Sequence, residues 1–284
     1  MVKVIGTDLD GTLFYPKKRF SMIPKRNVRF LERFSSDGGR VVLVSSRCDN
    51  FPPRIAKHLH IPFDFIGSNG SLMIIDGKVK ERNFFSKEEL TAIIHDIKTT
   101  TPPWIFMLNS KSYPLVLTRS GVRWIVSTIY KFYMWSQFAY KEPAVRSDHI
   151  FFSEVEKGEV YKLMLFVGIT KKQKLLAKRL AKEIAEKHPN VEVSWLNEVV
   201  EITPKGCTKA SAVAKYLDYL GISHDNILVV GDGGNDVPMF QMFPKHSYAM
   251  KHAHPSVKAK ASKTIRYLSD LEEELYPSAD KKDR

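Results

Sequence analysis

The chain has little cysteine, no long apolar run and no recognisable nucleic-acid module. Its 284 residues include only two cysteines, Cys48 and Cys207. Two are too few for a disulfide framework, so we expect a protein of the reducing cytoplasm. No apolar run approaches the ~20 residues that a membrane span needs, and the sequence enters its first predicted strand without the layout of a signal peptide. Paired zinc ligands and an aromatic RNA-stacking signature are also missing. We therefore expect neither a membrane nor a nucleic acid as the partner.

Acidic residues are also in the minority, and the resulting charge is strongly basic. The chain has 44 Lys and Arg against 31 Asp and Glu, a formal net charge of +13. Such a balance can attract nucleic acid, anionic membranes or small phosphorylated substrates. Much of it lies in Lys171–Lys187, where Leu175, Leu176, Leu180 and Ile184 recur at helical spacing. We interpret this segment as an amphipathic helix with a solvated basic face rather than as a polyanion site.

Strands and helices alternate near both ends of the chain, which is typical of a parallel sheet covered by helices. In the first part we predict strands over residues 2–7, 40–45 and 63–67, helices over 24–37 and 53–59, and a hairpin of 72–75 and 78–80. In the last part we predict a helix over 208–220, a strand over 226–230 and a helix that begins at Asn235.

The middle of the chain, residues 84–201, has a different texture. We predict helices over 87–98, 121–137 and 171–187, and strands over 105–108, 115–118, 150–153 and 161–167. This order indicates an α+β layer with a largely antiparallel sheet. The predicted fold is therefore α/β: a Rossmann-like parallel-sheet core of residues 1–83 and 202–284, with a second, α+β domain of residues 84–201 inserted into it.

The most informative segment is residues 4–13, in which an apolar strand delivers two aspartates into a Gly-Thr turn. On an extended backbone residues i and i+2 project to the same side, so we expect Asp8 and Asp10 to crowd one point. Two such carboxylates repel unless a cation lies between them or one holds a proton. One carboxylate can serve as a nucleophile, and a second can donate and recover a proton. The alternative is a strand that simply ends in a polar turn.

Two further motifs have groups that suit phosphate, and they follow a predicted strand or begin a helix. In open α/β sheets, ligands bind beyond the carboxyl ends of the strands. Residues 45–47 (Ser-Ser-Arg) offer hydroxyls and backbone amides to phosphate oxygens, although a plain serine turn is an equal alternative. Residues 205–209 (Lys-Gly-Cys-Thr-Lys) lead into a helix, whose N-terminus favours anions. A lysine there adds a point charge for a phosphoryl group, but lysines at helix starts are common.

The fourth motif, residues 231–236 (Gly-Asp-Gly-Gly-Asn-Asp), follows an apolar strand. Its glycines allow close backbone approach, and Asp232 and Asp236 bring two more acids to the same edge of the sheet. Hard oxygen ligands without a His or Cys cluster suit Mg²⁺, and the dense ladder of acids of a calcium loop is missing. Lone histidines such as His149 and His252 are interpreted as ordinary surface or core residues.

Taken together, the four motifs resemble, in order, those of the haloacid dehalogenase-like phosphatases. The matching residues are Asp8-Leu9-Asp10-Gly11-Thr12, Ser45, Lys209 and Gly231-Asp232-Gly233-Gly234-Asn235-Asp236. Three more segments resemble the Cof-like sugar-phosphatase branch: Ser68-Asn69-Gly70, Glu201-Ile202-Thr203-Pro204-Lys205-Gly206, and Tyr248-Ala249-Met250 with the following Ala253-His254-Pro255 and Val257-Lys258. That branch carries a large cap between its second and third motifs, where this chain has its 84–201 insertion.

The chain departs from the branch at two places. The second motif usually reads Thr-Gly-Arg, whereas this chain has Ser-Ser-Arg at residues 45–47. Because serine keeps the hydroxyl, phosphate binding is expected to survive. Near the end the branch usually has Gly-Asn-Ala, and this chain has Lys251-His252-Ala253, so a role for that asparagine does not carry over.

The resemblance implies a Mg²⁺-dependent phosphatase that acts on a small phosphorylated metabolite, such as a sugar phosphate, beneath a closing cap. Asp8 would attack phosphorus to give a phospho-aspartate, and Asp10 would protonate the leaving alcohol and then activate water. The implied metal-binding residues are Asp8, Asp10 through its carbonyl, Asp232 and Asp236, the last of which would orient Lys209 or a metal water. The implied phosphate-binding residues are Ser45, Ser46, Lys209 and Asn235, with Lys205 as the alternative to Lys209.

Two other functions stay open at this stage. A phosphotransferase or phosphomutase would use the same phospho-aspartate and pass the phosphoryl group to a sugar hydroxyl. A non-catalytic binder of phosphorylated ligands or nucleic acid would use the positive charge alone. Possible substrate contacts in the inserted domain are Trp104, Phe106, Asn109, Arg119, Arg123 and Trp124.

Overall fold

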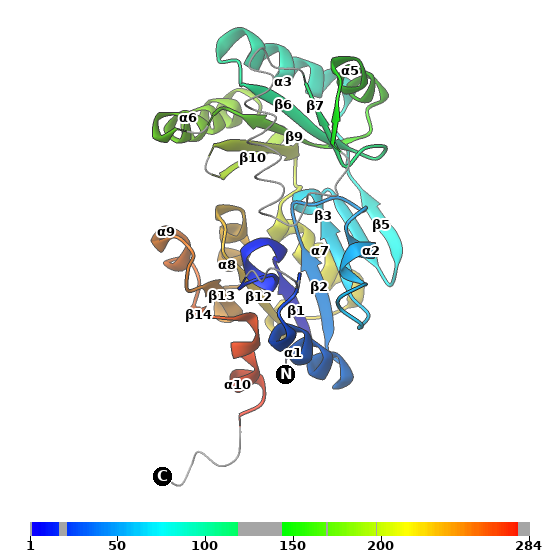
Figure 1. The fold of residues 1–284 in the computed structure, drawn as a ribbon, viewed down its shortest axis with the longest axis vertical. Helices are drawn as coiled ribbons and strands as arrows, with labels where there is room; N and C mark the ends of the chain where they lie inside the picture. Colours follow the sequence, from blue (N-terminus) through cyan, green and yellow to red (C-terminus); the bar gives the residue numbers. More distant parts are fainter. Residues whose placement is uncertain (1, 17–21, 119–143, 169, 197, 278–284) are drawn as a thin grey trace.

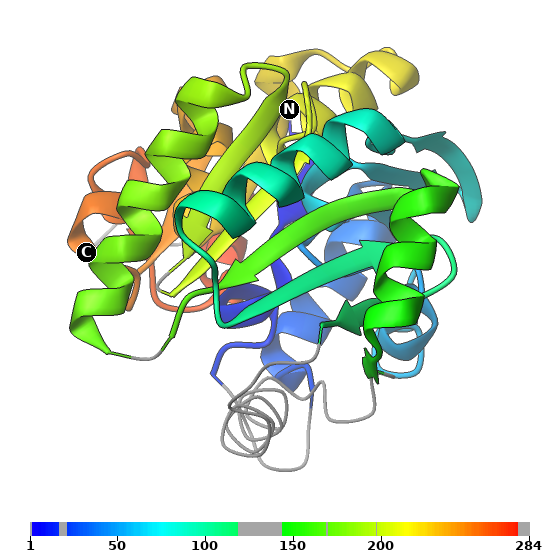
Figure 2. The same ribbon diagram turned by 90° about the horizontal axis from the view of Figure 1, so that it is seen from above.

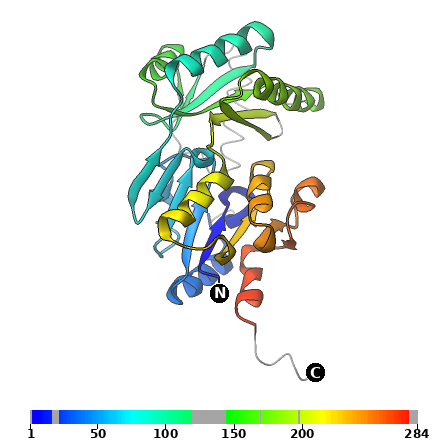
Figure 3. The ribbon, with the colours of Figure 1, turned by 180° about the vertical axis from the view of Figure 1, so that it is seen from behind.

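The computed structural model describes residues 2–16, 22–118, 144–168, 170–196 and 198–277. These residues form two sheets, one of eight strands and one of six, and Figure 1 shows the six-stranded sheet above the carboxyl ends of the larger sheet's central strands. The same arrangement is visible from behind in Figure 3. The predicted α/β fold with a parallel-sheet core is therefore confirmed.

The larger sheet has the strand order β14-β13-β12-β1-β2-β3-β4-β5. Its strands are β1 (Val4–Thr7), β2 (Arg40–Val44), β3 (Asp64–Gly67), β4 (Leu72–Ile75), β5 (Lys78–Arg82), β12 (Ile227–Gly231), β13 (Ser247–Met250) and β14 (Lys263–Ile265). Neighbours from β14 to β3 pair in parallel, while the hairpin β4–β5 is antiparallel, as its Asp76-Gly77 turn predicts.

Helices cover both faces of the larger sheet, so its central strands β1, β2 and β12 are buried on both sides and are mostly apolar. The helices are α1 (Lys25–Ser36), α2 (Pro52–Ile55), α7 (Lys209–Leu220), α8 (Val237–Met242), α9 (Pro255–Lys258) and α10 (Leu271–Leu275). Successive residues of β1 serve opposite faces: Ile5 packs in the same apolar cluster as Phe30 of α1, whereas Val4 packs with Val213 of α7.

The six-stranded sheet has the order β10-β11-β9-β6-β7-β8, and only β7 and β8 pair in parallel among its described strands. Its strands are β6 (Ile105–Ser110), β7 (Leu115–Leu117), β8 (Ala144–Arg146), β9 (Val160–Phe166), β10 (Val191–Leu196) and β11 (Val199–Pro204). Helices α3 (Lys87–Thr100), α5 (Asp148–Lys157) and α6 (Lys171–Lys187) cover the face away from the larger sheet (Figure 2). The opposite face is turned toward the larger sheet. We propose that this unit is the inserted domain, with its end placed after Pro204 because β11 continues to that residue.

Three predictions within the inserted domain need correction or comment. The predicted strand over 150–153 is wrong: these residues lie in α5, where the Ser147 side chain accepts a hydrogen bond from the Ile150 amide and Gly158 ends the helix in a left-handed conformation. A short apolar run does not distinguish a strand from a helix, and the cap residues decide it here. In α6, Leu180 and Ile184 are buried as predicted, but Leu175 is 71% exposed. The predicted helix over 121–137 lies outside the described residues.

None of the helices within the described ranges is long and apolar enough to cross a membrane.

Candidate active site

The strand register brings the sequence motifs to one edge of the larger sheet. Thr7 of β1 pairs with Val230 of β12 on one side and with Leu43 of β2 on the other. The chain therefore leaves these three parallel strands at nearly the same level, immediately before Asp8, Asp232 and Ser45 respectively. The edge is the one that faces the six-stranded sheet in Figure 1, where ligands bind in open α/β sheets.

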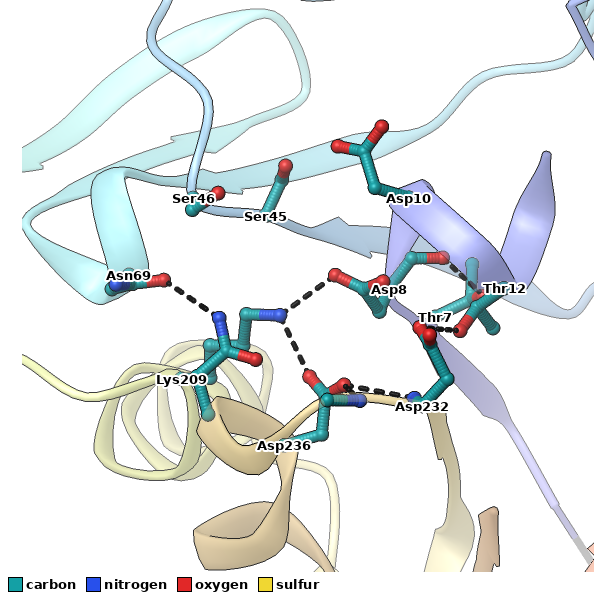
Figure 4. Close-up of polar contacts among 12 residues, drawn as sticks. Thr7, Asp8, Asp10, Thr12, Ser45, Ser46, Asn69, Lys209, Asp232 and Asp236 are labelled. Atoms are coloured by element: carbon teal, nitrogen blue, oxygen red, sulfur yellow. Dashed lines mark hydrogen bonds and ion pairs between the residues drawn. The ribbon is translucent and has the colours of Figure 1, made fainter. Parts of the chain in front are cut away.

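Three acidic side chains meet at this edge around one lysine. Carboxylate oxygens of Asp8, Asp232 and Asp236 all lie within 4.8 Å of one another. The Lys209 ammonium donates to Asp8 Oδ1 at 2.7 Å and to Asp236 Oδ1 at 2.7 Å (Figure 4). Lys209, Asp8 and Asp236 are buried, whereas Asp232 is half-buried. Four groups that the sequence separates by up to 228 positions, from 8 to 236, thus form one buried cluster, which we call the acidic group.

Backbone and hydroxyl donors fix the acids of this group. Asp236 Oδ2 accepts hydrogen bonds from the amides of Asp232 and Gly233, each at 2.9 Å. The Thr12 hydroxyl donates to Asp232 Oδ1 at 3.1 Å. These bonds fix two of the three carboxylates, those of Asp232 and Asp236.

The charges of the acidic group do not balance. With all three carboxylates ionised, one ammonium leaves a formal excess of two negative charges. This excess is unfavourable: burial together with the neighbouring acids raises the pKa of Asp8 despite the opposing effect of Lys209. Burial lowers the pKa of Lys209, but Asp236 and Asp8 raise it more, so Lys209 stays protonated. A divalent cation would neutralise the excess, and an all-oxygen donor set suits Mg²⁺. The residues present therefore fit the predicted metal.

Asp10 does not join the acidic group, so the expectation that the carboxylates of Asp8 and Asp10 crowd one point is wrong. The strand ends at Thr7 and the chain turns through Leu9–Leu13, so the two-residue alternation of a strand no longer applies. Asp10 instead accepts two hydrogen bonds from Arg47, from Nε at 2.8 Å and from Nη2 at 2.7 Å. Figure 4 shows its carboxylate directed away from that of Asp8.

The loop after β2 and the loop before β4 lie beside the acidic group. The Ser45 hydroxyl is buried and accepts a hydrogen bond from the Arg47 amide at 3.2 Å, and the Ser46 carbonyl accepts one from Lys162 at 3.0 Å. The Asn235 side chain donates to Asn69 Oδ1 at 3.5 Å. Ser45, Ser46 and Asn69 are drawn with the acidic group in Figure 4.

The two lysines at the start of α7 have different surroundings. Lys209 lies inside the acidic group, whereas Lys205 is 64% exposed and lies 3.6 Å from Glu192 of β10. The structure therefore selects Lys209 as the lysine of this site.

Several residues near the site were given no role in it from the sequence. Lys162 is 2% exposed and pairs with Glu201 at 2.7 Å, and both belong to the six-stranded sheet. A single lysine within the apolar run of residues 160–166 is a signal that was available, because a buried charge needs a partner. His252, interpreted as ordinary, lies 3.6 Å from Asp232 and stacks on Tyr15 with ring centroids 4.1 Å apart.

The candidate substrate contacts of the inserted domain have mixed positions. Phe106 is buried in the cluster beneath the helices, edge-on to Phe151, so it is a core residue. Trp104 packs against Phe166 on the other face of the sheet. Asn109 is buried, and its Oδ1 has no hydrogen-bond partner. Arg119, Arg123 and Trp124 lie outside the described residues.

Gly11 is expected to be indispensable for the acidic group. It has φ +84°, and a Cβ at this position would overlap the Asp232 carboxylate. Gly11→Ala is therefore expected to displace Asp232 and to lower any Mg²⁺-dependent activity by about a hundredfold, and to reduce the free energy of unfolding by about 1 kcal/mol. Gly38→Ala is the matched control, because Gly38 also has φ +84° but no atom within 4 Å of the added Cβ. Steady-state kinetics and urea unfolding of both variants check this; equal activity in the two would contradict it.

The sequence matches the family described as haloacid dehalogenase-like hydrolase over residues 5–270. A curated relative from Escherichia coli strain K12, the 5-amino-6-(5-phospho-D-ribitylamino)uracil phosphatase YbjI, is 22% identical over 267 residues, covering 92% of this chain and 89% of the relative.

Solved structures share the fold over nearly the whole chain. The structure of SMU.1108c from Streptococcus mutans UA159 has a TM-score of 0.79 and 25% identity, and it covers 97% of this chain and 99% of that one. A sugar phosphatase described as HAD subclass IIB, BT4131, has a TM-score of 0.74 and 21% identity, and it covers 96% and 99% of the two chains.

Proposed function

We propose that this phosphatase, which belongs to the Cof-like branch of the haloacid dehalogenase-like hydrolases, hydrolyses small phosphorylated metabolites such as sugar phosphates. In this proposal the reaction uses Mg²⁺ and proceeds through a phosphorylated Asp8. The observation that carries the proposal is the buried acidic group, in which Lys209 lies 2.7 Å from both Asp8 and Asp236. Such a group at the strand ends, with an excess of negative charge, supports a site for a divalent cation and a phosphate ester.

In the proposed reaction Asp8 is the nucleophile. Its carboxylate oxygen attacks phosphorus, an oxygen–phosphorus bond forms, and the bond from phosphorus to the leaving alcohol breaks. Water then attacks phosphorus and releases inorganic phosphate, which restores the Asp8 carboxylate. Mg²⁺, held by Asp8, Asp232, Asp236 and the Asp10 carbonyl, would offset the repulsion between the nucleophile and the phosphate dianion.

Positively charged and hydrogen-bonding groups hold the phosphoryl oxygens in this proposal. Lys209 contributes an ammonium, while Ser45, Ser46 and Asn235 contribute hydroxyl, backbone and amide donors. Phosphoryl transfer depends mainly on such positioning and charge stabilisation, because the protein has little covalent chemistry to perform.

Asp10 is the proposed general acid and base. It gives its proton to the leaving alcohol and takes one from the attacking water. In the structure Arg47 holds the Asp10 carboxylate through two hydrogen bonds.

The relatives favour small substrates but different ones. BT4131 is described as a sugar phosphatase and YbjI as the phosphatase of a ribitylamino-uracil phosphate. Both descriptions fit a phosphorylated polyol or sugar, which is the substrate class that we propose for this chain. We also propose that the inserted domain acts as the cap, and that the protein is cytoplasmic.

The test is a panel of phosphorylated metabolites, assayed for inorganic phosphate with Mg²⁺ and with EDTA. We expect release from at least one sugar or polyol phosphate, a loss of at least about a hundredfold on chelation, and recovery when Mg²⁺ is added back. Formation of an isomeric phosphate ester without free phosphate would favour the phosphomutase alternative. Turnover that is the same in EDTA would contradict the metal assignment.

A further inference from the structure

A series of polar contacts, buried at Glu201 and half-buried at its ends, joins the six-stranded sheet to the loops of the acidic group. Glu201 of β11 accepts hydrogen bonds from Lys162 of β9 at 2.7 Å and from Asn69 Nδ2 at 2.8 Å. Asn69 Oδ1 accepts in turn from Asn235 Nδ2 at 3.5 Å. Lys162 also donates to the Ser46 carbonyl at 3.0 Å. This series of contacts therefore runs from the proposed cap to both loops proposed to bind phosphate.

A gain in folding stability alone does not account for this series of contacts. Glu201 is 9% exposed and Lys162 is 2% exposed, and taking two such charges out of water costs about as much as their attraction returns. Apolar side chains of similar volume would stabilise the contact between the two sheets as well. The arrangement of donors and acceptors offers a different reason for the charged pair.

Glu201 fixes the direction of the hydrogen bonds that run through Asn69 to Asn235. Burial raises the pKa of Glu201, but Lys162 and the Asn69 hydrogen bond lower it more, so the group is an ionised carboxylate and only accepts hydrogen bonds. Asn69 must therefore turn its amide nitrogen toward Glu201 and its oxygen toward Asn235. That oxygen accepts one N–H of Asn235, whose amide nitrogen is left with a second N–H.

The backbone of Asn69 holds it in this place. Asn69 has φ +57°, a left-handed conformation that asparagine tolerates. Its amide donates to the Ser45 carbonyl at 3.0 Å, which ties the residue to the loop after β2. Asn69 is thus a fixed relay between Glu201 and Asn235 rather than a free side chain.

We propose that Glu201 is a positioning residue, which acts through Asn69 to turn an N–H of Asn235 toward the bound phosphoryl group. The inference rests on the proposed function, since that function assigns Asn235 to the phosphoryl oxygens. Glu201 does not touch the substrate; the proposed cap reaches the phosphate site through it.

The test measures the affinity for inorganic phosphate in the presence of Mg²⁺ by ³¹P NMR titration, which needs no turnover. Glu201→Gln keeps the shape of the side chain but replaces a carboxylate that only accepts with an amide that also donates. The direction of the hydrogen bonds through Asn69 is then no longer fixed. We expect phosphate to bind about tenfold more weakly, the effect of one lost hydrogen bond to a charged group. In an Asn235→Ala background the same substitution is expected to change the affinity less than twofold, because the Asn235 amide, the last group in the series of contacts, has been removed.

Two further variants separate positioning from general damage. Glu154→Gln removes another buried carboxylate of the same domain, which accepts from Ser110 at 2.7 Å and pairs with Lys157, and it is expected to leave phosphate affinity unchanged. Asn69→Gly keeps the left-handed backbone and deletes the relay, so it is expected to match Glu201→Gln, and it serves as the test if Glu201→Gln does not fold.

Three results would overturn the inference: wild-type phosphate affinity in both Glu201→Gln and Asn69→Gly, an equal effect of Glu201→Gln with and without Asn235, or no binding of inorganic phosphate by the wild type. These results are distinct from a failure of the proposed function. If no ester is hydrolysed but phosphate affinity follows the expected pattern, the positioning role stands and the hydrolase proposal falls.

Discussion

Asp8→Asn is expected to reduce phosphate release by at least about 10⁴-fold in kcat, the scale of loss when a nucleophile is removed from a covalent mechanism. An amide does not attack phosphorus at a useful rate, and the substitution leaves the size of the side chain unchanged. The reason for expecting so large an effect is geometric: Asp8 is 6% exposed, directly follows β1 and is bonded to Lys209. Steady-state assays with the substrate found in the panel provide the measurement.

Asp218→Asn is the control for this variant. Asp218 is an exposed aspartate of α7 that pairs with His224 at the surface, so its loss is expected to leave kcat within about twofold of the wild type. Circular dichroism of Asp8→Asn should match the wild type. A well-folded Asp8→Asn protein that keeps a tenth or more of its turnover would remove Asp8 from the nucleophile role.

Lys209→Met is expected to reduce both stability and activity. Removing the ammonium leaves Asp8 and Asp236 buried without their shared cation, which costs about 3–5 kcal/mol of unfolding free energy when no metal is present. Loss of the charge that faces the phosphoryl group is expected to lower kcat/KM by a further factor of about 10²–10³. Lys209→Arg is not expected to restore activity, because the wider guanidinium does not fit between two carboxylates that each lie 2.7 Å from one nitrogen.

The destabilisation of Lys209→Met is expected to depend on pH. Burial already raises the pKa of Asp8 and of Asp236, and Lys209 opposes that rise. Without Lys209 their pKa values rise further, so the folded state binds more protons than the unfolded state and stability falls as pH increases. Urea unfolding in EDTA should therefore show a larger loss at pH 8 than at pH 5. Lys205→Met, at an exposed lysine of the same loop, is expected to change stability by less than about 1 kcal/mol at either pH. A smaller loss for Lys209→Met at pH 8 than at pH 5 would contradict the assigned charge states.

The assembly of the acidic group could be predicted from the sequence because parallel strands fix the level at which the polypeptide leaves a sheet. Parallel strands place their following residues at one edge, so apolar runs ending in Asp8, Ser45 and residues 231–236 were sufficient to predict a common site. The choice between Lys205 and Lys209 could not be made in this way. It depends on how α7 packs against the sheet, which buries Lys209 and leaves Lys205 at the surface.

What the sequence could not supply are contacts that depend on tertiary packing. The turn after β1 sets the direction of the Asp10 side chain, in place of the two-residue alternation of a strand. Its partner Arg47 comes from another loop. Lys162 and Glu201 lie on separate strands of the other sheet, 39 positions apart. Their burial depends on this pairing and on contacts with Ser46 and Asn69, which only the folded structure brings together.

The central claim is that one cation and one phosphoryl group meet at Asp8, beside the loop of residues 231–236. It is tested most directly by a crystal structure from crystals grown with Mn²⁺, in place of Mg²⁺, and beryllium fluoride. Beryllium fluoride mimics a phosphoryl group on a carboxylate. We predict a beryllium–oxygen bond to Asp8 and an anomalous peak for the cation in contact with Asp8 and Asp232. A fluoride complex bonded elsewhere, or a cation bound away from these two carboxylates, would contradict the account.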